Sequence, residues 1–272
     1  MTTITGQRTF DQFRNTARSA IIDVKPAVVH LLTEGNLPEG ATWHPNGFAV
    51  FRLGSVQDFA TQHSIADSPW LSEANAEDML RLHVWPKNLR KPFADQPRTH
   101  SHSFWLTSQT LGGSYVDGIF AASSTPQHTN APASHRNDTG FGTDPYGLLD
   151  VCYVNPDLAE LVPNGETAFV SARGTRHRTP GNFHHMPAGV FHRTEIPDDE
   201  FCMTLLVTSA ERNGTDQIIQ DIDRVAQMIP RAPITSADLV HILDQTRAEI
   251  HRGNPQRSES PSHIPLGRSI SL

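Results

Sequence analysis

Residues 181–196 read GNFHHMPAGVFHRTEI, and the fold prediction for the whole chain starts from this stretch. Gly181 is followed, after five residues, by Pro187, then by Gly189 and by His192. Proline and glycine at this spacing are typical of a tight turn. We therefore expect the chain to reverse here and to place His192 on the strand that follows.

A second histidine pair lies upstream, in residues 99–113, which read THSHSFWLTSQTLGG. Side chains at positions i and i+2 of a β-strand point to the same face, so His100 and His102 are expected to aim both imidazoles into one space. Imidazole binds Fe, Zn, Cu and Ni, and three nitrogen ligands leave coordination positions open for chemistry. We predict that His100, His102 and His192 bind one metal ion.

Together the two segments resemble the two signature motifs of the cupin superfamily. The matching residues are Gly181, Pro187, Gly189 and His192 in one motif and His100, His102 and Gly113 in the other. The resemblance covers about half of the chain, residues 81–209. It implies a mainly β, cupin-type barrel (double-stranded β-helix, or jelly-roll) with a metal inside, flanked by N-terminal and C-terminal helices.

The first motif departs from the family at its usual glutamate ligand, which should fall near Leu106 or Thr107. A three-histidine site without a carboxylate resembles the thiol dioxygenases such as cysteine dioxygenase, which implies Fe(II) and O2; Zn, Mn, Ni or Cu are the alternatives. Glu195 is expected on the opposite face of its strand from His192. Asp150 and Glu166 stay open as further ligands.

Other polar residues are candidates for substrate binding or proton transfer beside the metal. Arg98 shares the strand face of the two histidines and could clamp a substrate carboxylate, or lie at the barrel rim in water. Arg81 is a weaker candidate for the same role. One of His184 and His185 should face the cavity, and we assign His185 as a catalytic proton shuttle, against a surface imidazole.

Two features of neighbouring strands each have two interpretations. Tyr115 is a candidate catalytic hydroxyl, although a tyrosine on a barrel strand is more often packed in the core. Residues 79–85 alternate, with Arg81, His83 and Trp85 on one face. That face lines either a cavity or a solvated edge.

Composition excludes several classes of protein. The 272 residues carry a net charge of −7 without a basic run, which argues against a nucleic-acid surface. No apolar run reaches about 18 residues, so no membrane span is expected. The first residues lack the order of a signal peptide, so we expect a cytoplasmic protein. Cys152 and Cys202 lie in apolar surroundings and are predicted to be buried, reduced thiols.

We expect a single cupin domain over residues 1–252, with an N-terminal extension (1–78), C-terminal helices (216–252) and a flexible tail (253–272). The predicted helices cover residues 9–20, 27–32, 75–80, 216–228 and 236–252. The predicted hairpins turn at Gly112–Gly113 and around Gly174, and residues 123–146, with His128 and His135, form a lid or flap. The last two helices should either pack on the barrel or build a homodimer contact.

Three functions are consistent with these patterns. The first is a non-heme Fe(II)-dependent oxygenase acting on a small anionic or amino-acid-like metabolite with O2. The second is a metal-dependent isomerase, lyase or hydrolase that uses Zn, Mn or Ni as a Lewis acid. The third is a cupin that binds a small molecule without catalysis.

Overall fold

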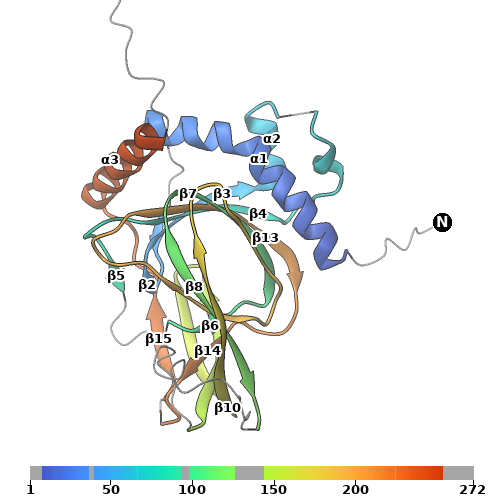
Figure 1. Cartoon of the computed structure of the whole chain (residues 1–272), viewed down its shortest axis with the longest axis vertical. Helices are drawn as coiled ribbons and strands as arrows, with labels where there is room; N and C mark the ends of the chain where they lie inside the picture. The colour runs from blue at the N-terminus through green and yellow to red at the C-terminus, as the bar shows by residue number, and fades with distance from the viewer. Residues whose placement is uncertain are drawn as a thin grey trace, which may run out of the picture.

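The computed structural model describes residues 8–36, 40–65, 67–92, 98–125, 144–223 and 225–253, with backbone alone at 211 and 212. Two antiparallel sheets face each other around a cavity, and helices cover the outer face of one sheet (Figure 1). This arrangement confirms the expected mainly β fold class, a barrel of antiparallel sheets with helices near both ends of the chain.

The first sheet has six strands in the order β1-β3-β4-β13-β7-β11 within the described chain. Their bounds are Thr42–Trp43 (β1), Ala49–Ser55 (β3), Met79–Trp85 (β4), Cys202–Arg212 (β13), Phe104–Gly113 (β7) and Phe183–Met186 (β11). Strand β4 lies between β3 and β13, so residues 79–85 are a central strand and not a solvated edge.

In the described part of the chain, the second sheet has seven strands in the order β15-β10-β8-β12-β6-β14-β9, and β9 also pairs with β10. Their bounds are Gln227–Pro230 (β15), Leu158–Arg178 (β10), Tyr115–Ser123 (β8), Phe191–Glu195 (β12), His100–Ser101 (β6), Gln217–Gln220 (β14) and Tyr146–Asn155 (β9). Strands β2 (Asn46–Gly47) and β5 (Lys91–Pro92) form a separate small pair.

Helix α1 (Phe10–Glu34) begins at a capping box in which Thr9 and Gln12 satisfy each other's backbone N–H groups, and it ends at Gly35 with φ of 78°. It runs through Pro26 without a break, so the two predicted helices are one. A proline inside a helix costs about 3 kcal/mol. The buried apolar stripe that continues on both sides of Pro26, from Ile21 to Leu32, offsets this cost.

Shorter helices complete this layer. They are α2 (Val56–Gln62), a 3₁₀ turn at Pro69–Ser72 and α3 (Ser236–Gly253). Helix α3 confirms the prediction for residues 236–252, and it packs against α1 and β7 on the outside of the barrel. Within the described residues, no helix is both long enough and apolar enough to span a membrane.

The main core lies between α1 and the outer face of the first sheet (Figure 1). Leu80, Leu82 and Val84 of β4 are fully buried in this core. Because side chains alternate along a strand, the other face of β4 turns into the barrel, where Arg81, His83 and Trp85 line the cavity.

Several predicted elements are wrong. Residues 112–113 do not form a hairpin, because β7 pairs with β13 and β11 whereas β8 pairs with β10 and β12. Gly113 instead passes the chain from one sheet to the other. Residue Gly174 is a bulge within the continuous strand β10, where the register with β8 shifts.

Two predicted helices are also wrong. Residues 75–80 form a turn that leads into β4. Residues 216–228 contain β14 and part of β15, because Ile218 and Ile219 are buried where β14 completes the second sheet between β6 and β9. The predicted lid lies largely outside the described residues, as do His128, His135 and the tail after Gly253.

We predict that Gly113→Ala destabilises the protein much more than Gly165→Ala. Both glycines have positive φ, 67° and 81°, so both variants carry about 1 kcal/mol of backbone strain. A Cβ at 113 would also lie 1.9 Å from the carbonyl oxygen of Phe201, whereas one at 165 would meet no atom within 4 Å. Urea unfolding should show a difference of at least about 2 kcal/mol; equal losses would contradict the crossover geometry.

Candidate metal centre and its cavity

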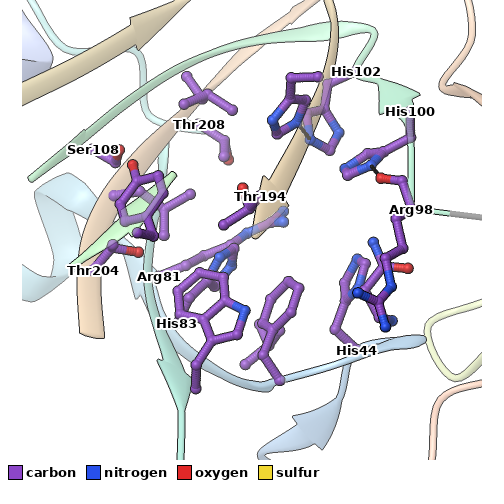
Figure 2. A pocket seen from close by; sticks show the side chains of 18 of the residues that line it. His44, Arg81, His83, Arg98, His100, His102, Ser108, Thr194, Thr204 and Thr208 are labelled. Atoms are coloured by element: carbon purple, nitrogen blue, oxygen red, sulfur yellow. Dashed lines mark hydrogen bonds between the residues drawn. The ribbon is translucent and has the colours of Figure 1, made fainter. Parts of the chain in front are cut away.

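The three predicted histidines meet at one point of the cavity wall. Their ring nitrogens lie within 4.8 Å of one another, and the Nε2 atoms of His102 and His192 are 3.3 Å apart. Two nitrogens bound at about 2.1 Å to one tetrahedral ion lie about 3.4 Å apart. The spacing therefore fits a shared metal ion, and Figure 2 shows His100 and His102 turned toward the same space.

The backbone brings the two motifs together. His192 in β12 is the direct antiparallel partner of His100 in β6, so their side chains share a face of the second sheet. The N–H of Gly189, a residue with φ of 78°, donates to the carbonyl of His102 at 2.8 Å. The predicted turn is thus hydrogen-bonded to the backbone of one ligand while it delivers another.

A buried carboxylate that sequence reasoning missed lies behind the cluster. Asp117 of β8 is 0% exposed, and its two oxygens lie 3.3 Å from Nδ1 of His192 and 3.3 Å from Nε2 of His184. A carboxylate that accepts the Nδ1 proton leaves the Nε2 lone pair free for a metal. The available signal was one acidic residue in the otherwise apolar strand sequence YVDGIFA.

Among the described residues, no carboxylate joins the three-histidine group as a further ligand. Glu195 pairs with Arg193 at 2.6 Å. Asp150 accepts hydrogen bonds from Asn164 and Gln217, and Glu166 is exposed.

His185 does not lie where it was predicted. Its Nδ1 contacts the Thr107 hydroxyl at 3.1 Å on the face of the first sheet that meets α1. Burial, followed by the charges of Arg14 and Arg18 in α1, lowers its pKa to about 4. The assignment of His185 to the cavity is therefore wrong, and His184 is the member of the pair that lines it.

The other predicted residues line the cavity. Arg98 is exposed beside His100 and His44, and Arg81 reaches inward with its guanidinium 5.8 Å from the centre of the Phe104 ring (Figure 2). Tyr115 is buried in the wall, and burial raises the pKa of its phenol above the usual value. Its hydroxyl is therefore a proton donor rather than a base at neutral pH.

The cavity has a volume of about 810 Å³ and includes polar groups that sequence reasoning did not single out. His44 stacks on Phe48, with ring centroids 4.2 Å apart. Arg231 lies over the ring of Tyr153, whose hydroxyl donates to Asp216 at 2.7 Å. His44 and Arg231 come from segments outside both motifs, so no local pattern marked them.

Burial lowers the pKa of several histidines in the cavity wall and so favours their neutral form. Desolvation by burial, followed by electrostatic repulsion from His192, lowers the pKa of His100 to about 4. Burial also lowers the pKa of His102 well below its usual value. Burial, with Arg81 and Arg231, lowers the pKa of His83 to about 3. Imidazoles held neutral keep a lone pair available for a metal ion.

The two cysteines are both free, so no disulfide joins them. Cys202 is buried as predicted. Cys152 is exposed, because it lies in the part of β9 whose surroundings are open to solvent.

No protein-family model and no curated protein matches this sequence. Among solved structures, the chain is similar to one from the crystal structures of the DMSP lyases RdDddP and RnDddQII, with 13% identity and a TM-score of 0.28. The match covers 66% of this chain and 53% of the other, so it spans about half of that protein's length. No conclusion about the reaction follows from a likeness at this level.

The fold and the cluster define this protein as a β-barrel of two antiparallel sheets with a group of three histidines that could hold a metal ion.

We predict that Asp117→Asn weakens zinc binding by about 10–100-fold, because the amide no longer holds His192 and His184 by charge. Competition against a chromophoric chelator would measure the affinity. Asp150→Asn is the matched control, since it also removes a hydrogen-bonded carboxylate of the second sheet but leaves the cluster untouched. Unchanged zinc affinity in a folded Asp117→Asn protein would contradict the positioning role.

We predict that His83 makes the protein sensitive to acid. Its folded pKa of about 3 lies below the unfolded value of 6.5, so the unfolded chain binds more protons between these values and stability falls as the pH drops. From about pH 7 to about pH 4.5, wild type should lose about 1–2 kcal/mol more than His83→Gln in urea unfolding. Replacing exposed His30 with Gln should not change the loss; an equal loss in His83→Gln would refute the prediction.

Proposed function

We propose that this protein is a metal-dependent enzyme whose three-histidine centre binds a divalent transition metal and whose cavity takes an organic anion. The observation that carries the proposal is the convergence of His100, His102 and His192 on one side of a cavity of about 810 Å³. The three histidines come from two distant segments, and Asp117 contacts His192 from behind. Packing alone does not require such an arrangement, whereas a metal site does.

Fe(II) is the metal we propose first, with Zn, Mn, Ni or Cu as alternatives, because three neutral ligands leave several coordination positions open. Bound ferrous iron would supply oxidation of the substrate by O2. The chain's own residues would keep water away from that chemistry: Phe104, Leu106 and Met186 form a buried apolar cluster beside the histidines.

The charge of the cavity favours an anionic substrate. Arg81 and Arg98 line it, and among the described residues no carboxylate forms an ion pair with Arg98. An arginine fork recognises a carboxylate with two parallel hydrogen bonds. The volume of the cavity is toward the upper end of the range of about 300–1,000 Å³ for ligand pockets, so the substrate need not be as small as an amino acid.

A second candidate is a metal-dependent lyase, isomerase or hydrolase without redox chemistry. It is favoured by the imidazoles of His44, His83 and His184 on the cavity wall, whose ring nitrogens can form hydrogen bonds to a bound substrate. The protonated hydroxyl of Tyr115 is a matching donor. Zn, Mn or Ni would serve this chemistry as a Lewis acid.

Metal analysis with an oxygen assay tests the proposal. Purified protein should bind about one transition-metal ion per chain, and His100→Ala/His102→Ala should bind none, because one imidazole cannot replace three. His30→Ala, which changes an exposed histidine of α1, should keep the metal.

Reconstituted anaerobically with Fe(II), the protein should consume O2 when a panel of organic acids is added. Turnover with zinc in the absence of O2 would favour the second candidate. Ligand binding that survives in the double variant, with no turnover under either condition, would leave a binding protein and refute the enzymatic proposal.

A further inference from the structure

Four aromatic rings form a continuous surface on the cavity wall, which we call the aromatic wall: Phe48, His83, Trp85 and Tyr115. Phe48 lies with its ring centroid 4.9 Å from His83 and 4.5 Å from Trp85. Trp85 and Tyr115 are nearly parallel, 18° apart, with centroids separated by 6.5 Å. The rings come from three separate segments, so the fold gathers them at one place.

The aromatic wall is open to the cavity rather than enclosed in a core. Phe48 and Tyr115 are buried, whereas His83 and Trp85 keep partial exposure and line the cavity. The same strand, β4, fills the true core with Leu80, Leu82 and Val84 on its other face. Rings that stay accessible inside a hollow barrel offer their faces to a ligand.

Positive charge lies beside these rings. Arg81 and Arg231 both line the cavity, and Arg81 lies two residues from His83 on the same face of β4. The guanidinium of Arg231 is 5.4 Å from the Tyr153 ring centre, and no carboxylate in the described chain forms an ion pair with it. An anion in the cavity would be the natural counter-charge.

The aromatic wall and the histidine cluster belong to one space. His44 stacks on Phe48, and its ring lies 6.3 Å from that of His100. On the other side, the guanidinium of Arg81 lies over Phe104, whose ring stacks on His102 at 4.7 Å. A ligand lying on the aromatic wall would therefore have its reactive end beside the three histidines.

We propose, on the basis of the proposed function, that the substrate is an aromatic carboxylic acid larger than a single ring. Its ring system lies on Trp85 and His83, and its carboxylate pairs with Arg231 and Arg81. An aliphatic acid would satisfy the arginines but leave the rings uncovered. A cationic aromatic compound would match the rings but be repelled by the arginines.

Calorimetry with matched ligands tests the two halves of this inference. Zinc-loaded wild type should bind 2-naphthoate about fivefold more tightly than its saturated counterpart, decahydro-2-naphthoate, because only the flat ring stacks. It should bind 2-naphthoate about tenfold more tightly than neutral 2-naphthamide, because only the acid pairs with arginine. Wild-type protein that binds the flat and saturated acids equally, or binds neither, would overturn the inference.

Two pairs of variants locate the site. Trp85→Leu should remove the preference for the flat acid, and Trp85→Phe should restore most of it. Arg231→Met should remove the preference for 2-naphthoate over 2-naphthamide, whereas Arg14→Met, which changes an arginine of α1 outside the cavity, should leave it unchanged. Preferences that survive in Trp85→Leu and Arg231→Met would overturn the assignment. The wild-type comparison holds even if a variant does not fold.

The same ligands distinguish this inference from the metal-dependent function. If the metal-free His100→Ala/His102→Ala protein keeps both ligand preferences while Fe(II)-loaded wild type consumes no O2 and zinc-loaded protein shows no turnover, the aromatic-acid site stands and the enzymatic proposal fails. If Fe(II)-loaded protein consumes O2 with a saturated acid as readily as with a flat one, the enzymatic proposal stands and the aromatic-acid inference fails.

Discussion

The pairing of β6 with β12 is the constraint on which the candidate site depends. It sets His192 directly opposite His100 in the antiparallel pair, although 91 residues lie between them in the sequence. The hydrogen bond from Gly189 to the carbonyl of His102 holds the adjoining turn to the same region. A slip of one residue would turn His192 to the opposite face of the sheet, because side chains alternate, and the cluster would be lost. The site is therefore a consequence of strand register.

The outer face of the first sheet packs in the main core, and its inner face lines the cavity. Because the core is on the outer face, a cavity is compatible with a stable barrel. Its outer face buries Leu80, Leu82 and Val84 beneath α1, so the main apolar core lies outside the barrel rather than within it. The inner face is then free to carry charged and aromatic groups such as Arg81 and Trp85. A small barrel that relied on its interior for stability would have to fill that space with aliphatic side chains.

Patterns that depend on near neighbours were readable from the sequence. The strand over residues 79–85, the final helix and the convergence of three histidines all follow from periodicity or from two short motifs. Failures occurred where distant contacts overrode a local preference. Residues 216–228 have helical spacing, but Ile218 and Ile219 gain more from burial between β6 and β9 than a surface helix would give them. Gly112–Gly113 reads as a hairpin turn, but its neighbouring strands belong to opposite sheets.

The chemistry around the histidines shows the same limit. Alternation predicted that one of His184 and His185 faces inward but could not say which, because that depends on which face of β11 meets α1. Asp117 and Arg231 belong to no sequence motif. Their roles become visible only in the structure, where Asp117 contacts His192 and Arg231 lines the cavity. Ligand residues are thus found from short spacings, whereas the groups that orient them and recognise a substrate are set by the three-dimensional packing of the barrel. For that reason the histidines of the candidate metal centre can be predicted from the sequence, whereas the groups around them require the structure.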